Sequence, residues 1–249
     1  MENNIALITG ASRGIGAATA KLLAQQGLHI IVNYHKNKKA ALSVVQDIIE
    51  HGGSAQVIQA DISQEADIIK LFKKIDHING NLTVLVNNAG ILFQQSSIEN
   101  LSAERILKVM NTNVIGYILC CREAVKRMAT RHGGKGGAIV NVSSAAARLG
   151  APGEYIDYAA SKGAIDTLTT GLSLEVAEQK IRVNSVRPGF IYTEMHADGG
   201  EANRVDRLSE NIPMKRGGQP EEVAQAISWL LSDKASYVTG SHIDLAGGK

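Results

Sequence analysis

The start of the chain restricts its fold most strongly. An apolar run at residues 5–8 leads into Thr9-Gly10-Ala11-Ser12-Arg13-Gly14-Ile15-Gly16 and then into a helix-like segment at residues 17–26. A strand that passes through a glycine-rich turn into a helix offers free backbone N–H groups and a partial positive charge to a pyrophosphate. A glycine triplet also occurs in ordinary turns. Its place directly after the first strand therefore carries the prediction of a dinucleotide-binding α/β domain.

The alternation of strand-like and helix-like segments continues to the end of the chain. We expect strands near 5–9, 29–33, 54–59, 82–87, 137–143, 181–186 and 241–245, and helices near 14–26, 38–50, 65–78, 102–131, 154–178 and 220–232. The strands are nearly continuous apolar runs, as in a parallel sheet that is covered on both faces. Since no linker interrupts the pattern, residues 1–249 are expected to form a single α/β domain, a doubly wound, Rossmann-like parallel sheet.

The bulk properties exclude several functional classes. A net charge of +2 gives no reason to expect nucleic-acid or membrane binding, and no apolar run reaches transmembrane length. Residues 1–4 lead directly into the first strand, so we expect no secretory signal. The neighbouring Cys120 and Cys121 suit reduced thiols in a cytoplasmic protein. The seven histidines show no metal-ligand spacing, so no metal site is assigned.

Tyr158 and Lys162 are four residues apart in a predicted helix and so share one face. A free tyrosine has a pKa near ~10, and a neighbouring cation favours the phenolate. The pair is therefore a candidate acid–base catalyst. The spacing by itself is also common on solvated helix surfaces, so the rest of the chain has to support this interpretation.

Five further segments supply that support in chain order. They are Thr9-Gly10-x-x-x-Gly14-x-Gly16, Asn87-Asn88-Ala89-Gly90, Asn113-Val114-Ile115-Gly116, Ile139-Val140-Asn141-Val142-Ser143-Ser144 and Pro188-Gly189-Phe190-Ile191-Tyr192-Thr193. With Tyr158 and Lys162, they resemble the short-chain dehydrogenase/reductase family, including its 3-oxoacyl-thioester reductases and glucose dehydrogenases. The resemblance covers nearly the whole chain.

The resemblance implies hydride transfer between a nicotinamide cofactor and a carbonyl or secondary alcohol. It assigns Tyr158 as proton donor or acceptor, Lys162 as the residue that lowers the Tyr158 pKa and holds the nicotinamide ribose, and Ser144 as donor to the carbonyl oxygen. It assigns Asn113 to a water that connects Lys162 to solvent. Asn111 and Ser143 are the rivals of Asn113 and Ser144, and the motif positions favour the latter two.

The second predicted strand ends at Asn33, where an NAD-preferring member usually carries an acid. The missing acid and the nearby Arg13 favour NADP(H), with NAD(H) as the alternative, because a guanidinium suits the 2′-phosphate. Lys36, Lys38 and Lys39 could equally be a solvated helix start. Asp61 is expected at the adenine or, alternatively, as a helix N-cap. The expected cofactor contacts are Gly10, Ser12, Arg13, Gly14, Ile15, Gly16, Asn33, Tyr34, His35, Asp61, Ile62, Asn88, Ala89, Gly90, Tyr158, Lys162, Pro188, Gly189, Ile191 and Thr193.

The substrate and the preferred direction are left open. Residues 145–157 and 190–215 should line the pocket, and the weakly apolar stretch 193–212 with Gly199-Gly200 is expected to form a mobile lid. Acyl thioesters, sugars, steroids and small ketones all remain candidates. Leu245 and Ala246 depart from the family's usual C-terminal spacing, and the 145–157 loop is about one residue longer than usual.

Two predicted helices, 102–131 and 154–178, carry apolar residues on more than one face, which favours a homo-oligomer, expected as a homotetramer. Two other functional classes are considered: a cofactor-binding regulatory or structural protein without turnover, and a methyltransferase on a similar fold. The complete set Asn113, Ser144, Tyr158 and Lys162 speaks against the first, because binding alone needs neither Ser144 nor Tyr158. The methyltransferase gains no support from Tyr158 and Lys162.

Overall fold

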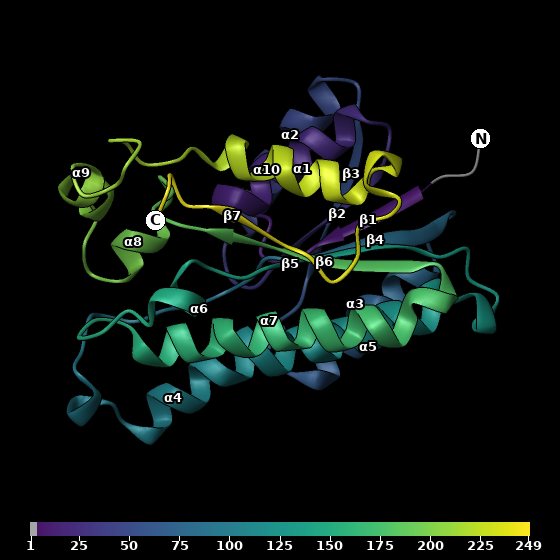
Figure 1. Ribbon diagram of the computed structural model, residues 1–249. Coiled ribbons are helices and arrows are strands. Elements are labelled where there is room, and N and C mark those ends of the chain that lie inside the picture. The colour runs from purple at the N-terminus through teal and green to yellow at the C-terminus, as the bar shows by residue number, and fades with distance from the viewer. Residues whose placement is uncertain (1–3) are drawn as a thin grey trace.

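Seven parallel strands form the centre of the computed structural model, which describes residues 4–249 (Figure 1). The strand order is β3-β2-β1-β4-β5-β6-β7, which confirms the predicted doubly wound, Rossmann-like sheet. The strands are β1 (Asn4–Ile8), β2 (His29–Tyr34), β3 (Ser54–Gln59), β4 (Asn81–Asn87), β5 (Gly137–Val142), β6 (Ile181–Pro188) and β7 (His242–Leu245).

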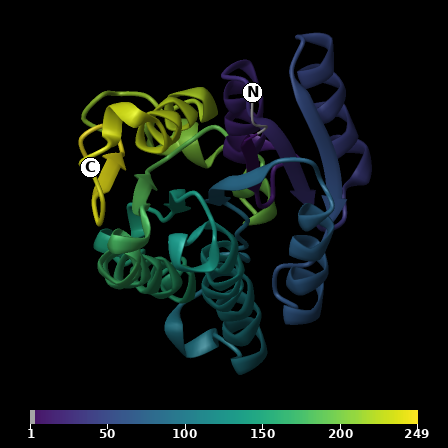
Figure 2. The ribbon, with the colours of Figure 1, turned by 90° about the vertical axis from the view of Figure 1, so that its right-hand side faces the viewer.

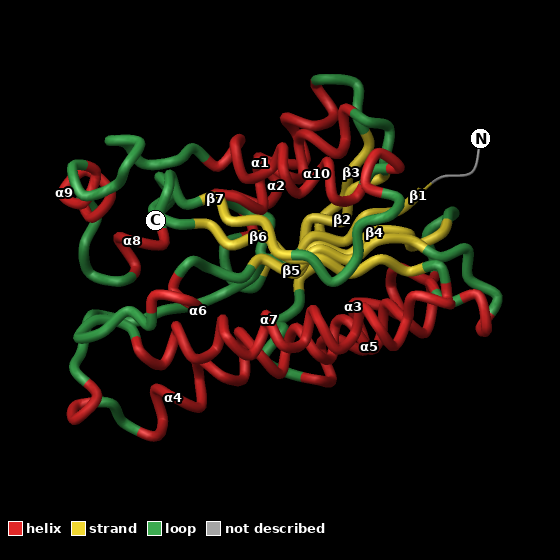
Figure 3. Tube along the Cα trace, in the orientation of Figure 1, coloured by secondary structure: helices red, strands yellow, loops and turns green. Residues whose placement is uncertain are grey.

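Helices cover both faces of this sheet, as Figure 3 shows by colour. One face carries α1 (Gly14–Gln25), α2 (Lys38–Glu50) and α10 (Pro220–Leu231). The other carries α3 (Glu65–Asp76), α4 (Ala103–Met110), α5 (Gly116–Met128) and α7 (Ile156–Val176). Figure 2 shows the green and teal helices on the side opposite the yellow α10.

Alternate residues of each strand supply the two cores. In β1, Ile5 and Leu7 pack with Phe72 and Tyr117 on one face, whereas Ala6 and Ile8 pack with Leu23 of α1 on the other. Because both faces are buried, the strand must be apolar at every position, and this produces the continuous run seen in the sequence.

The predicted helix at 102–131 is present over residues 103–128, and it contains one irregular turn that the sequence does not predict. The chain forms α4, then a five-residue π-helical turn η2 (Asn111–Ile115), and then α5. Gly116 begins α5 against the backbone of Ile62, where an added Cβ would lie 2.5 Å from the Ile62 carbonyl oxygen. The extra residue of a π turn re-aims side chains, and such turns occur frequently at functional sites.

Three short helices that the sequence pattern does not predict lie beyond the carboxyl ends of the strands. They are α6 (Ala146–Leu149), α8 (Met195–Asp198) and α9 (Arg204–Ser209). Leu245 and Ala246 also pack here, since the Gly189 N–H donates to the Leu245 carbonyl at 2.9 Å and Ala246 covers Gly189. Among residues 4–249, no helix is both long enough and apolar enough to cross a membrane. The predicted absence of a secretory signal concerns an end whose residues 1–3 lie outside the described range.

Candidate active site

The glycine-rich loop after β1 packs against the end of β4. Gly10 and Gly14 have φ angles of +61° and +54°, which favour glycine. A Cβ on Gly10 would lie 2.8 Å from Ala89, and one on Gly16 would lie 2.5 Å from the Asn88 side chain. Thr9 Oγ1 accepts hydrogen bonds from the N–H groups of Asn88 and Ala89 at 2.9 and 3.1 Å. These contacts bring the two motifs together.

The N-terminus of α1 has the properties that a pyrophosphate site requires. Arg13 occupies the N-cap position without a side-chain cap, and no acidic residue lies in the first turn of the helix. The first N–H groups and the positive end of the helix dipole therefore remain available to an anion. Ser12 and Ile15 belong to the same turn. The residues present fit a dinucleotide.

The residues expected at the adenosine end of the site make hydrogen bonds within the protein that the sequence does not predict. Asn33 is buried within β2, and its amide donates to the carbonyls of Ile58 and Ala60 at 3.2 Å each. Its Oδ1 accepts from the Gly10 N–H at 3.2 Å. Asn33 thus fastens the glycine loop to β3.

The groups around Asn33 are also paired. Tyr34 is buried at the end of β2, whereas His35 lies 3.4 Å from Asp61. Asp61 also accepts from the Ser63 N–H at 2.9 Å in a local turn. The N-cap of α3 is Gln64, so Asp61 does not fill the alternative capping role. Arg13 forms an ion pair with Asp198 of α8.

Asn113 lies in the π turn and is fully buried. Its amide donates to the Ile91 carbonyl at 2.9 Å and to Ser161 at 3.1 Å, and its Oδ1 accepts from the Ile91 N–H at 2.9 Å. The side chain therefore holds the segment that follows Asn88-Ala89-Gly90. A Cβ on Gly90 would lie 3.5 Å from Asn113 Oδ1 and 3.6 Å from Lys162 Nζ, so both predicted catalytic groups face this glycine. The half-buried Asn111 makes no comparable contact with Ile91.

The two serines after β5 have different surroundings. Ser143 is buried and donates to the Lys162 carbonyl at 3.1 Å, which ties β5 to α7. Ser144 accepts from the Ala146 N–H at 3.1 Å and contacts the Pro188 carbonyl at 3.4 Å. It also hydrogen-bonds the Tyr158 hydroxyl. Ser144 is therefore the serine that lies with the tyrosine, as the motif position favours.

Tyr158 and Lys162 lie one turn apart on α7, and Lys162 Nζ is 5.6 Å from the centre of the Tyr158 ring. Lys162 Nζ donates to the Val142 carbonyl at 2.7 Å and contacts the Tyr117 hydroxyl at 3.4 Å. Burial lowers the pKa of Lys162 to about 7, opposed by the carboxylate of Asp166. Burial likewise raises the pKa of Tyr158 to about 12, opposed by the hydrogen bond from Ser144. In the protein alone, burial therefore raises the Tyr158 pKa, whereas the sequence predicts that Lys162 lowers it.

One cavity of about 350 Å³ is lined both by predicted catalytic residues and by predicted cofactor contacts. Its lining includes Ser144, Tyr158 and Lys162 together with Ile15, Asn88, Pro188, Gly189, Ile191 and Thr193. A larger hollow of about 520 Å³ lies beside it, between Lys21 and Glu221, and contains none of the four predicted catalytic residues. The smaller cavity is therefore the candidate active site.

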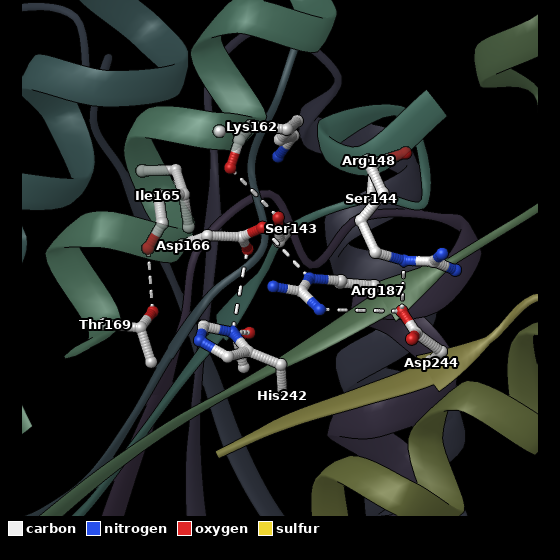
Figure 4. A network of polar contacts seen from close by, with 12 residues as sticks. Ser143, Ser144, Arg148, Lys162, Ile165, Asp166, Thr169, Arg187, His242 and Asp244 are labelled. Atoms are coloured by element: carbon white, nitrogen blue, oxygen red, sulfur yellow. Dashed lines mark hydrogen bonds and ion pairs between the residues drawn. The ribbon is translucent and has the colours of Figure 1, made fainter. Parts of the chain in front are cut away.

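A network of charged residues lies outside this cavity (Figure 4). Asp166, one turn beyond Lys162, accepts from Arg187 at 2.9 Å, and its other oxygen lies 3.7 Å from His242. Arg187 also lies 3.9 Å from Asp244 of β7, which pairs with Arg148 of α6 at 3.3 Å. The network connects α6, α7 and the end of β6 to the C-terminal strand β7. This network was not predicted from the sequence, although the spacing of residues 158, 162 and 166 places them on one face of a helix.

No group of three or more His, Cys, Asp and Glu side chains within residues 4–249 is arranged to hold a metal ion. Cys120 and Cys121 are buried free thiols, and desolvation raises the pKa of each well above its usual value.

Comparison with known proteins agrees with this geometry. Residues 10–249 match the family described as enoyl-(acyl carrier protein) reductase. The chain is 71% identical to the uncharacterized oxidoreductase YgfF of Escherichia coli over 98% of this chain and 99% of that protein. It is 38% identical to a 3-oxoacyl-[acyl-carrier-protein] reductase of Synechocystis, covering 98% of this chain and 96% of that protein.

A solved structure is similar over the same length. The crystal structure of a dehydrogenase/reductase from Sinorhizobium meliloti matches with a TM-score of 0.90 and 31% identity, covering 100% of this chain and 95% of that one. A glucose 1-dehydrogenase of Bacillus subtilis is 36% identical over 100% of this chain and 95% of its own length. The motifs, the sheet and these relatives together show that the chain is an oxidoreductase that belongs to the NAD(P)-binding short-chain dehydrogenase/reductase family.

Proposed function

We propose that this enzyme interconverts a carbonyl compound and a secondary alcohol with NADP(H), and that Tyr158 is its acid–base catalyst. One observation carries the proposal: Ser144, Tyr158 and Lys162 line the same cavity as Ile15 of the glycine loop and the 188–193 segment. A substrate carbonyl at Tyr158 would therefore lie beside the nicotinamide of a bound cofactor.

When bound, the reduced nicotinamide supplies a hydride to the carbonyl carbon. Tyr158 donates its phenolic proton to the carbonyl oxygen, so the product is a neutral alcohol. Ser144 donates a hydrogen bond to the same oxygen, where negative charge develops in the transition state. In the oxidative direction, Tyr158 accepts the proton.

Lys162 has two roles in this proposal. As a cation, it stabilises the phenolate that Tyr158 leaves after proton transfer. With a pKa of about 7, lowered by burial, it can also gain and lose a proton near neutral pH and so restore the proton of Tyr158. Asn113 holds the π turn beside Lys162 through its bonds to Ile91, and we assign to it the positioning of a water that leads to solvent.

The preference for NADP(H) over NAD(H) rests on the absence of an acid at Asn33 and on Arg13. Arg13 is half-exposed and paired with the half-exposed Asp198. An exposed pair of this kind is worth only about 0–1 kcal/mol, so a phosphate dianion can displace the carboxylate. Release of Asp198 would also free α8, which is part of the proposed lid at 193–212.

We further propose a single domain over 1–249, a cytoplasmic location and a homotetramer. The oligomer is supported by apolar side chains that the described chain leaves exposed: Ile115 and Ile118 on the α5 side, Leu174 on α7, and Trp229 and Tyr237 near α10. Exposed apolar groups on several faces suit contacts with further copies of the chain.

The experiment is a panel of carbonyl compounds and secondary alcohols, followed by NADPH absorbance with NADH run in parallel. We expect a higher kcat/KM with NADPH. Tyr158→Phe should bind NADP(H) nearly as the wild type does but lose at least ~10²-fold in turnover, the scale of a positioned proton donor. Ser143→Ala is the matched control, because Ser143 contacts the Lys162 backbone instead. Near-native activity of Tyr158→Phe would remove Tyr158 from the mechanism.

A further inference from the structure

The part of the cavity lining that the expected cofactor contacts do not supply is largely apolar. Leu92, Leu149, Tyr155, Phe190 and Met195 form this part of the lining. These residues come from the segment after β4, from α6 and the loop before α7, and from the segment after β6. The part of the cavity left for the substrate body is therefore bounded by aliphatic and aromatic side chains.

One buried arginine interrupts this apolar wall. Arg204 of α9 lines the cavity, and its side chain is only 7% exposed. Its guanidinium lies 5.1 Å from the centre of the Tyr155 ring and 5.5 Å from that of Phe190. A desolvated cation in a substrate pocket normally suggests an anionic substrate.

Here the guanidinium is already neutralised. Both terminal nitrogens of Arg204 bind the two carboxylate oxygens of Glu154, one of them at 2.8 Å. Glu201 accepts from the same arginine at 3.2 Å and also pairs with Arg207. The four side chains alternate in sign and sum to zero charge. Glu154 lines the cavity, whereas Glu201 approaches Arg204 from outside its lining.

The other ionisable groups of the lining do not provide an interior anion site. Lys162 already binds the Val142 carbonyl and the Tyr117 hydroxyl. Burial lowers the pKa of His196, whose Nε2 lies 3.1 Å from the Ile191 carbonyl. Lys249 lies against Phe190 and is exposed, so water screens its charge.

We propose that Glu154, by occupying Arg204, sets the charge selectivity of the cavity, which admits compact uncharged carbonyl compounds with an apolar body and rejects anionic ones. This inference rests on the proposed carbonyl chemistry. An anionic substrate would have to compete with a bidentate carboxylate that is part of the protein, and it would bury a second negative charge beside Glu154.

The test compares ethyl acetoacetate with acetoacetate, which share a carbonyl and differ in charge. The wild type should favour the ester in kcat/KM by at least ~10-fold. Glu154→Gln has nearly the same shape but frees the Arg204 fork toward the cavity. It should raise the ratio of acid to ester by at least ~10-fold, because the Arg204 nitrogens that lose the Glu154 carboxylate gain a charged partner from the acid. The control Glu201→Gln removes a carboxylate from the same arginine outside the lining and should leave the ratio within ~3-fold.

A binding measurement separates this inference from the proposed function. Melting temperatures with NADP⁺ are compared for added benzamide and benzoate, a neutral and an anionic ligand of similar shape. Stabilisation of the wild type by benzamide, and of Glu154→Gln by benzoate, supports the charge selectivity. If neither ester nor acid is turned over but these ligands behave as expected, only the proposed chemistry fails. Equal responses to both ligands, a wild-type preference for the acid, or an equal change of ratio in Glu201→Gln would overturn the inference.

Discussion

Replacing Asn33 with aspartate should destabilise the fold instead of cleanly redirecting cofactor choice. The sequence alone suggests that an acid at this position would repel a 2′-phosphate and favour NAD(H). In the structure Asn33 is 2% exposed, and its amide donates to two backbone carbonyls. A carboxylate would lose both donated hydrogen bonds and place an unpaired charge against two carbonyl oxygens. Buried, uncompensated charges of this kind cost about 3–5 kcal/mol.

The penalty should depend on pH in a defined direction. Burial and the facing carbonyls raise the folded-state pKa of the introduced carboxyl, so the folded protein binds more protons than the unfolded chain. The charge-dependent penalty is absent below the unfolded pKa of ~3.9 and grows by about 1.4 kcal/mol per pH unit up to the folded pKa. Stability relative to the wild type therefore falls as the pH rises.

Urea unfolding followed by circular dichroism, at several pH values, measures this difference. In a thermal scan at pH 8, the same loss should lower the melting temperature by roughly 10 °C. The matched control is Asn37→Asp, because Asn37 is an exposed N-cap that accepts from the Ala40 N–H at 3.0 Å, a role that aspartate fills equally well. An Asn33→Asp variant as stable as the control at pH 8 would refute the argument from burial.

Three further predictions concern the catalytic lysine, the lid and the assembly. Burial lowers the pKa of Lys162 to about 7, so between about pH 7 and the unfolded pKa of ~10.4 only the unfolded chain holds the proton. Wild-type stability relative to Lys162→Met should rise over that window, and a stability difference that does not change with pH in urea unfolding would contradict the lowered pKa of Lys162. Residues 193–212 should gain hydrogen-exchange protection with NADP(H), whereas strong, equal protection in both states would rule out the lid. Light scattering at micromolar concentration should give the mass of a tetramer, and a mass near 26.5 kDa would leave the chain a monomer.

The order of the elements and much of the candidate site could be predicted from the sequence. Continuous apolar runs identify strands because a sheet covered on both faces must be apolar at every position. The glycine loop, Ser144, Tyr158 and Lys162 are local patterns, and topology places their strand ends at one edge of the sheet. Local patterns of this kind can be recognised in the sequence without knowledge of distant contacts.

Tertiary contacts decided the rest. The π turn depends on Asn113 meeting Ile91 and on Gly116 meeting Ile62, contacts that no helical periodicity encodes. The internal role of Asn33 depends on the carbonyls of Ile58 in β3 and of Ala60 just after it. The neutralisation of Arg204 depends on Glu154, which lies 50 residues away. The sequence shows which charged and amide groups are present. Only the fold determines which of these groups pair with one another and which remain free to bind a ligand, because burial and pairing set the energies of these groups.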